Sequence, residues 1–116
     1  MNTSVYFYHT PGKDGVKTKR YTIAGIVEGN VIKMAASACS LNDQFVKRVG
    51  RRIALQRAEN VPYSRVAIES SALPGLAFVQ LAKIFAERLK TEELQIRKGK
   101  VFINPNLAYA DLQISE

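Results

Sequence analysis

Three mostly apolar runs, separated by short polar segments, mark three strands in the first part of the chain. Residues 4–10, 19–27 and 31–38 are rich in β-branched and aromatic side chains, which favour strands. Segments that contain Gly, Pro, Asn and Asp, residues 11–15 and 28–30, separate these strands. Short connections of this kind join antiparallel neighbours, so the pattern predicts two consecutive β-hairpins.

Residues 43–57 instead show the repeat of a helix. Its apolar stripe consists of Phe45, Val46, Val49, Ile53 and Ala54. Ser40 is a suitable N-cap, and Asp43 follows at the spacing of a capping box, so we expect the helix to begin there and to end near Ala58. Gly50 in its middle would allow the helix to lie close to a sheet.

The second half of the chain predicts a shorter set of elements. Residues 63–70 form a fourth strand, residues 76–90 form a largely apolar and therefore mostly buried helix, and residues 94–97 and 100–103 form a hairpin around Lys98 and Gly99. We expect one α+β domain over residues 1–116. Its antiparallel sheet, in β-β-β-α-β-α order, packs against two helices, with the hairpin at the C-terminal side.

Composition places the chain among ordinary globular domains. It has 116 residues, 47% of them hydrophobic, which suffices for one core without disulfides. No apolar run is long enough to span a bilayer, and the first residues lack the pattern of a signal peptide, so we expect no membrane association. Cys39 is the single cysteine, which fits the reducing cytoplasm.

Positive charge is concentrated in the first half of the chain. The net charge is +7; residues 1–60 hold ten Lys and Arg against four Asp and Glu, whereas residues 61–116 hold seven against six. Such asymmetry favours an anionic partner. Many basic domains bind no polyanion, so charge alone does not decide the matter.

The helix at residues 43–57 carries the strongest functional signal. Lys47, Arg48, Arg51 and Arg52 are spaced by one, three and four residues and therefore gather on one side of the helix, away from its apolar stripe. They can neutralise backbone phosphates. The competing interpretation is a solvated helix face, partly covered near Leu55, with Arg57 paired internally.

Aromatic residues on the first two strands suggest a second contribution. Tyr6 and Tyr8 share one face of their strand, and Tyr21 lies beside Lys19 and Arg20 on the next. Tyrosines among cations suit the stacking of unpaired bases, although tyrosines also serve in cores. The full expected nucleic-acid site comprises Lys47, Arg48, Arg51, Arg52, Lys17, Lys19, Arg20, Tyr6, Tyr8 and Tyr21.

Other kinds of site find little support. One His and one Cys cannot form a closed zinc site, so we expect no metal and no cofactor. Cys39 and His9 are the only candidate nucleophile and base, on strands one and three, which could be neighbours. A Cys in a run of small residues is, however, commonly buried. The PGKDG segment lacks the spacing of a phosphate-binding P-loop. We therefore expect neither an enzyme nor a small-molecule substrate.

One segment resembles a known group of sequences. The pattern falls on Cys39, Ser40, Asp43, Phe45, Lys47, Gly50, Arg51, Ile53, Ala54 and Arg57. It resembles small uncharacterised proteins of bacteriophages and prophages, and the strand-turn-strand segment before it is similar in kind. The resemblance covers residues 20–58 and implies a phage or mobile-element context, without an activity.

Together these observations predict a non-enzymatic cytoplasmic protein that binds nucleic acid largely independently of sequence. We expect DNA to be the partner rather than RNA, with a possible preference for single strands over duplexes. The alternative is a protein-interaction or self-assembling accessory module that engages a host protein, because the apolar second helix offers a surface for a homodimer.

Overall fold

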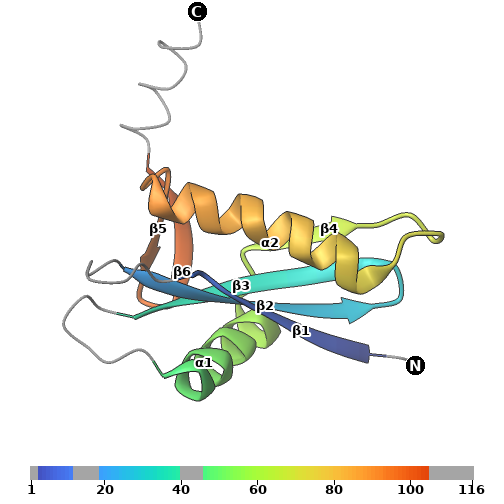
Figure 1. Cartoon of the computed structure of the whole chain (residues 1–116), viewed down its shortest axis with the longest axis horizontal. Coiled ribbons are helices and arrows are strands. Elements are labelled where there is room, and N and C mark those ends of the chain that lie inside the picture. Colours follow the sequence, from blue (N-terminus) through green and yellow to red (C-terminus); the bar gives the residue numbers. More distant parts are fainter. Residues whose placement is uncertain (1–2, 12–18, 40–45, 105–116) are drawn as a thin grey trace, which may run out of the picture.

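A four-stranded antiparallel sheet with one helix on each face forms the body of the protein (Figure 1). The computed structural model describes residues 3–11, 19–39 and 46–104. The sheet has the strand order β1-β2-β3-β4, and a separate two-stranded sheet pairs β5 with β6. The elements are β1 (Thr3–His9), β2 (Arg20–Glu28), β3 (Val31–Cys39), α1 (Lys47–Asn60), β4 (Ser64–Ala67), α2 (Pro74–Lys90), β5 (Leu94–Arg97) and β6 (Lys100–Ile103).

The predicted α+β class and the β-β-β-α-β-α order are confirmed. The strands at Leu94–Arg97 and Lys100–Ile103 coincide with the predicted hairpin. Gly29, at a φ of 61°, makes the two-residue connection between β2 and β3, a conformation that glycine adopts without steric cost. The turn and its antiparallel register therefore follow from the sequence.

Helix α2 covers one face of the sheet and builds the larger core. Alternate residues of β2 and β3 face it, among them Ile23, Ile32 and Met34. Phe78 of α2 is 1% exposed and lies over Gly25, where a β-carbon would approach its ring to 2.3 Å. The absence of a side chain at Gly25 is thus what admits the phenyl ring.

Helix α1 covers the opposite face through a smaller, alanine-rich core. Ala54 and Ala58 of α1 pack on Ala24 and Ala35 of the sheet, with Ile26 beside them. Small side chains on both partners bring the helix close to the strands. Because both faces of β2 are covered, seven consecutive residues of this strand are buried, whereas a sheet with one wet face shows alternation.

The start of α1 differs from the prediction. The N-cap is Val46 in an extended conformation, and no side chain caps the first turn. The expected N-cap Ser40 and its partner Asp43 lie outside the described residues, and the helix begins at Lys47 rather than beside them. The four cations of the predicted site consequently occupy the first turns of α1 instead of its middle.

Candidate nucleic-acid interface

The first two turns of α1 present the four cations predicted from the sequence. Lys47, Arg48 and Arg52 are exposed, and Arg51 is half-buried at the junction with the sheet. Lys47 and Arg51 are four residues apart, as are Arg48 and Arg52, so each pair lies along one line of the helix surface. Helical geometry thus places four positive groups side by side.

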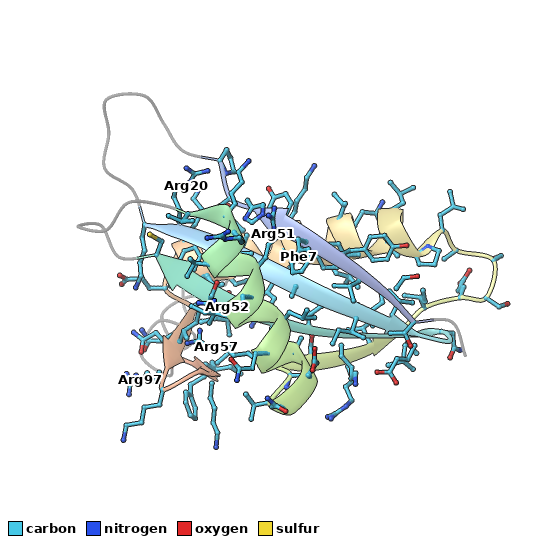
Figure 2. All side chains as sticks on the ribbon, turned by 90° about the horizontal axis from the view of Figure 1, so that it is seen from below. Phe7, Arg20, Arg51, Arg52, Arg57 and Arg97 are labelled. Atoms are coloured by element: carbon cyan, nitrogen blue, oxygen red, sulfur yellow. The ribbon has the colours of Figure 1, made fainter. Side chains whose placement is uncertain are left out.

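The sheet orients Arg51 and the neighbouring cation Arg20. The Arg51 guanidinium lies 6.0 Å from the centre of the Phe7 ring, which faces α1 from β1. Arg20, at the start of β2, donates from Nε and Nη2 to the carbonyl of Thr10, both at 3.1 Å. Figure 2 shows Arg20, Arg51 and Phe7 together beside the beginning of α1. Strand and helix cations therefore meet at one end of the sheet.

The pKa of His9 is sensitive to the cations at this end of the sheet. Its Nδ1 lies 2.9 Å from the hydroxyl of Thr22, on the α1 face of the sheet. The pKa of His9 is lowered first by burial and then by the charges of Lys47, Arg51 and Arg20. Like charges disfavour protonation of the imidazole. Cations from α1 and β2 are thus close enough to act on the same group.

Internal ion pairs do not neutralise the helix cations in the part of the chain that the structure describes. Its ion pairs there join Lys33 to Glu28 at 2.6 Å and Arg88 to Glu93 at 2.8 Å. No described carboxylate lies within 4.0 Å of the cations at positions 47, 48, 51 and 52. Described carboxylates therefore leave these four cations unneutralised, and Lys47, Arg48 and Arg52 are also exposed, whereas Arg51 is half-buried.

The three predicted stacking residues lie on the other side of the sheet. Tyr21 is 6% exposed, and its hydroxyl donates to the carbonyl of Leu89 at 3.4 Å. Tyr6 stacks on Phe78 with ring centres 5.9 Å apart, and Tyr8 packs against the same core. Because α2 covers this face, the tyrosines stabilise the core and the sheet separates them from the α1 cations. We therefore remove them from the candidate site.

The remaining predicted residues divide between the site and its surroundings. Lys19 is exposed next to Arg20, with its Nζ 5.9 Å from the centre of the Tyr21 ring. Lys17 lies outside the described residues. Arg57 donates from Nη1 to the carbonyl of Ala36 at 3.0 Å, and burial lowers its pKa. As expected, Arg57 is engaged internally and joins α1 to β3.

The Cys39 and His9 pair is not assembled. Strand β2 lies between β1 and β3, so His9 pairs with Thr22 and Cys39 pairs with Arg20. The idea that the first and third strands are neighbours is thus wrong. In the described part of the chain, no three His, Cys, Asp or Glu side chains come together to hold a metal ion, and neither helix is long and apolar enough to cross a membrane.

Sequence reasoning missed one group of basic residues. Arg97, Lys98 and Lys100 are all exposed around the turn between β5 and β6. The net charge of residues 61–116 is nearly zero, so it gives no indication of this local group of cations. The available signal was local: three cations within four positions around a glycine turn.

No protein-family model matches the chain, and no curated protein sequence or solved structure matches it significantly. The site is therefore interpreted from its own residues.

Proposed function

We propose that this protein is a non-enzymatic nucleic-acid-binding protein with little sequence preference. Lys47, Arg48, Arg51 and Arg52 would contact backbone phosphates, and Lys19 and Arg20 would extend the contact along the end of the sheet. Salt-dependent contacts of this kind supply most sequence-independent affinity. The resemblance of residues 39–57 to phage proteins is the ground for placing this function in a phage or mobile element.

One observation supports the proposal most: the cations occupy the end of α1 that is least favourable for them. The N-terminus of a helix is the positive end of its dipole, and acidic residues normally stabilise its first turn. The first turn of α1 contains no acidic residue, and the like-charged pairs at spacing four, Lys47 with Arg51 and Arg48 with Arg52, repel each other. A bound polyanion would offset both costs and would also suit the helix N-terminus.

A salt titration of a double variant tests this proposal. Arg51→Ala/Arg52→Ala should weaken binding to single-stranded DNA, duplex DNA and RNA alike. The slope of log affinity against log salt should flatten by roughly 1.4 to 1.8, since two phosphate contacts are lost. Fluorescence anisotropy with three labelled probes of equal length measures both quantities and ranks DNA against RNA.

A matched control removes the same charge elsewhere. Lys83 and Lys90 are exposed on α2, across the sheet from α1, so Lys83→Ala/Lys90→Ala keeps the net charge equal to that of the test variant. This control should retain most of the salt slope. Equal slopes in the wild type and in the Arg51/Arg52 variant would remove α1 from the interface, and an absence of binding to every probe at low salt would overturn the function.

Exposed apolar residues on α2 favour a second candidate function, self-assembly. Leu73 is 70% exposed, Leu76 59% and Ile84 60%, and these positions lie near one side of the helix. Exposed apolar groups of this size commonly mark interfaces. Sedimentation of the wild type and of Leu76→Glu at several concentrations tests this: a concentration-dependent dimer that the variant abolishes supports a homodimer through α2.

A further inference from the structure

The turn between β5 and β6 holds two cations directly opposite each other. Lys98 and Gly99 have φ values of 52° and 80°, as the type I′ turn of a two-residue hairpin requires. Arg97 and Lys100 therefore pair across the strands, with Lys98 at the tip. Like charges at directly opposite positions destabilise a hairpin. No carboxylate of the described chain lies within 4.0 Å of these three cations, so the repulsion is not relieved internally.

An exposed aromatic ring lies on the same face of the hairpin. Phe102 pairs with Gln95, two steps in register from the pair formed by Arg97 and Lys100. Alternation places Phe102, Arg97 and Lys100 on the outer face, whereas Leu94 of the inner face is 1% exposed. Phe102 itself is 49% exposed. The Arg97 guanidinium is steadied by a 2.6 Å hydrogen bond from Nη2 to the Gln95 side-chain oxygen.

The ring and the cations border one hollow. It has a volume of about 370 Å³, and the described residues that line it are Arg97, Lys98, Lys100 and Phe102. This volume is at the lower end of the range of ligand-binding pockets, which is roughly 300–1,000 Å³. One apolar ring among three cations provides a flat surface for a base and positive groups for its phosphates.

The turn of the hairpin contacts a side chain of the helix that carries the cation face. A β-carbon at Gly99 would lie 3.3 Å from Nε of Arg57, so the turn rests against this α1 side chain. Arg57 is in turn fixed by its hydrogen bond to the carbonyl of Ala36. Figure 2 shows Arg52, Arg57 and Arg97 following one another from the helix to the hairpin. A bound strand that leaves α1 at Arg52 would next meet the hairpin.

We propose that the β5–β6 hairpin is the base-contacting part of the interface and that it makes the protein a binder of unpaired nucleic-acid strands. Phe102 stacks on one base, while Arg97, Lys98 and Lys100 contact the adjoining phosphates. The partner is single-stranded because a duplex keeps the faces of its bases covered by their neighbours, whereas single-strand binders combine stacking aromatics with a basic groove. This inference rests on the proposed function, since α1 supplies the remaining phosphate contacts.

Tryptophan fluorescence tests the stacking directly. The chain contains no tryptophan, so Phe102→Trp introduces a single reporter at the proposed stacking position. Titration with a single-stranded oligonucleotide should quench its emission. The matched control is Ser71→Trp, because Ser71 is exposed in the connection between β4 and α2, which lies at the other end of the molecule from the β5–β6 hairpin (Figure 1). Its emission should be unchanged by the same oligonucleotide.

Affinity measurements complete the test. Phe102→Ala should weaken binding to a single-stranded oligonucleotide roughly 5- to 100-fold and leave duplex binding unchanged, since loss of one stacked base has an effect of this size. Phe102→Trp should retain the affinity of the wild type. Circular dichroism checks that the variants keep the fold.

The outcomes separate this inference from the proposed function. If single strands bind with an α1-dependent salt slope but Phe102→Ala binds them as the wild type does, and the Phe102→Trp emission is not quenched, the hairpin has no role and the proposed function stands. If no nucleic acid binds at all, both fail. Capture of a protein partner that depends on Phe102 while no single strand binds would also overturn the inference.

Discussion

Gly50 of α1 lies directly over Thr22 of β2: a β-carbon at position 50 would be 2.5 Å from the Thr22 hydroxyl oxygen. Thr22 is 1% exposed, and its hydroxyl contacts His9. The carbonyl of Gly50 also accepts a 2.9 Å hydrogen bond from the Ser37 hydroxyl. The glycine therefore sets how closely the basic helix approaches the sheet, as its position in the sequence suggested.

Gly50→Ala is accordingly expected to destabilise the fold. In an exposed helix this change stabilises by about 1 kcal/mol, because Ala is the better helix former. Here the added methyl group must displace a buried side chain, so we expect the free energy of unfolding to fall by roughly 1–3 kcal/mol. Urea denaturation monitored by circular dichroism measures the difference.

A double-mutant cycle identifies the cause of that loss. Thr22→Ala removes the hydroxyl that the new methyl group would strike, so Gly50→Ala should cost less in the Thr22→Ala background than in the wild type. A Gly50→Ala variant more stable than the wild type would show that α1 shifts away from the sheet without cost.

The sequence predicts the element order because its periodicities are local and strong. The predicted hairpin around Lys98 and Gly99 is confirmed with the same strand bounds, because a glycine between two short apolar segments favours a tight turn. The predicted beginning of α1 is too early, because Ser40 and Asp43 fit a capping pattern whereas the N-cap of α1 is Val46. Capping preferences indicate several residues at which a helix could begin, but they do not fix its first residue.

The tyrosines show a different limit. Period-two alternation correctly groups Tyr6 with Tyr8, but it does not reveal that a helix covers each face of the sheet. Which face meets water depends on long-range packing, for example of Phe78 on Gly25, and a single sequence does not encode this in any local pattern. The sequence likewise predicts the hairpin but not its place beside α1, since that relation runs through the distant contact of Gly99 with Arg57.

Arg57 is expected to matter for stability more than for binding. Arg57→Ala removes the hydrogen bond to the Ala36 carbonyl and the side chain on which Gly99 rests. Hydrogen bonds from charged groups contribute about 1.5–3 kcal/mol, so the free energy of unfolding should fall by roughly that amount. Urea denaturation of Arg57→Ala measures it, with Arg52→Ala, an exposed cation of the same helix, as the control that should change little.

The outcome for Arg57 also bears on the hairpin. If Arg57→Ala unfolds as the wild type does, the contact between α1 and the turn contributes nothing, and the hairpin is held by its own inner face. Retention of the wild-type salt slope in Arg57→Ala is expected, because its guanidinium is directed to the Ala36 carbonyl rather than to solvent.

Substitution of Tyr6 tests whether this tyrosine stabilises the core or stacks on a base. Its ring stacks on Phe78, and a β-carbon at Gly75 would lie 3.1 Å from it. Tyr6→Ala should therefore lower the free energy of unfolding, by less than the roughly 3–5 kcal/mol of a fully buried aromatic residue, because Tyr6 is half-buried. The milder Tyr6→Leu removes the ring but keeps an apolar side chain, so it should keep the affinity for single strands. Weaker binding by a stably folded Tyr6→Leu would return this tyrosine to the interface.

His9 makes stability depend on pH in a defined direction. Burial and the charges of Lys47, Arg51 and Arg20 hold the pKa of His9 below its ordinary value of 6.5. The unfolded chain therefore takes up a proton more readily than the folded chain, so stability is fully present above about pH 6.5 and is lost as the pH falls toward the lowered pKa. Urea midpoints of the wild type at pH 8, 6.5 and 5 should fall along this series, and those of His9→Gln should fall less.

The same residue links pH to binding, with the opposite sign. Phosphates placed beside Lys47, Arg51 and Arg20 would offset the repulsion that disfavours protonation of His9, so its pKa should rise in the complex. Binding would then take up a proton, and affinity for a single-stranded oligonucleotide should increase as the pH falls from 8 to 6. Anisotropy titrations at fixed ionic strength measure this for the wild type and for His9→Gln. Identical pH dependence in the two proteins would place the phosphates away from His9, nearer Arg48 and Arg52 on the outer line of the helix.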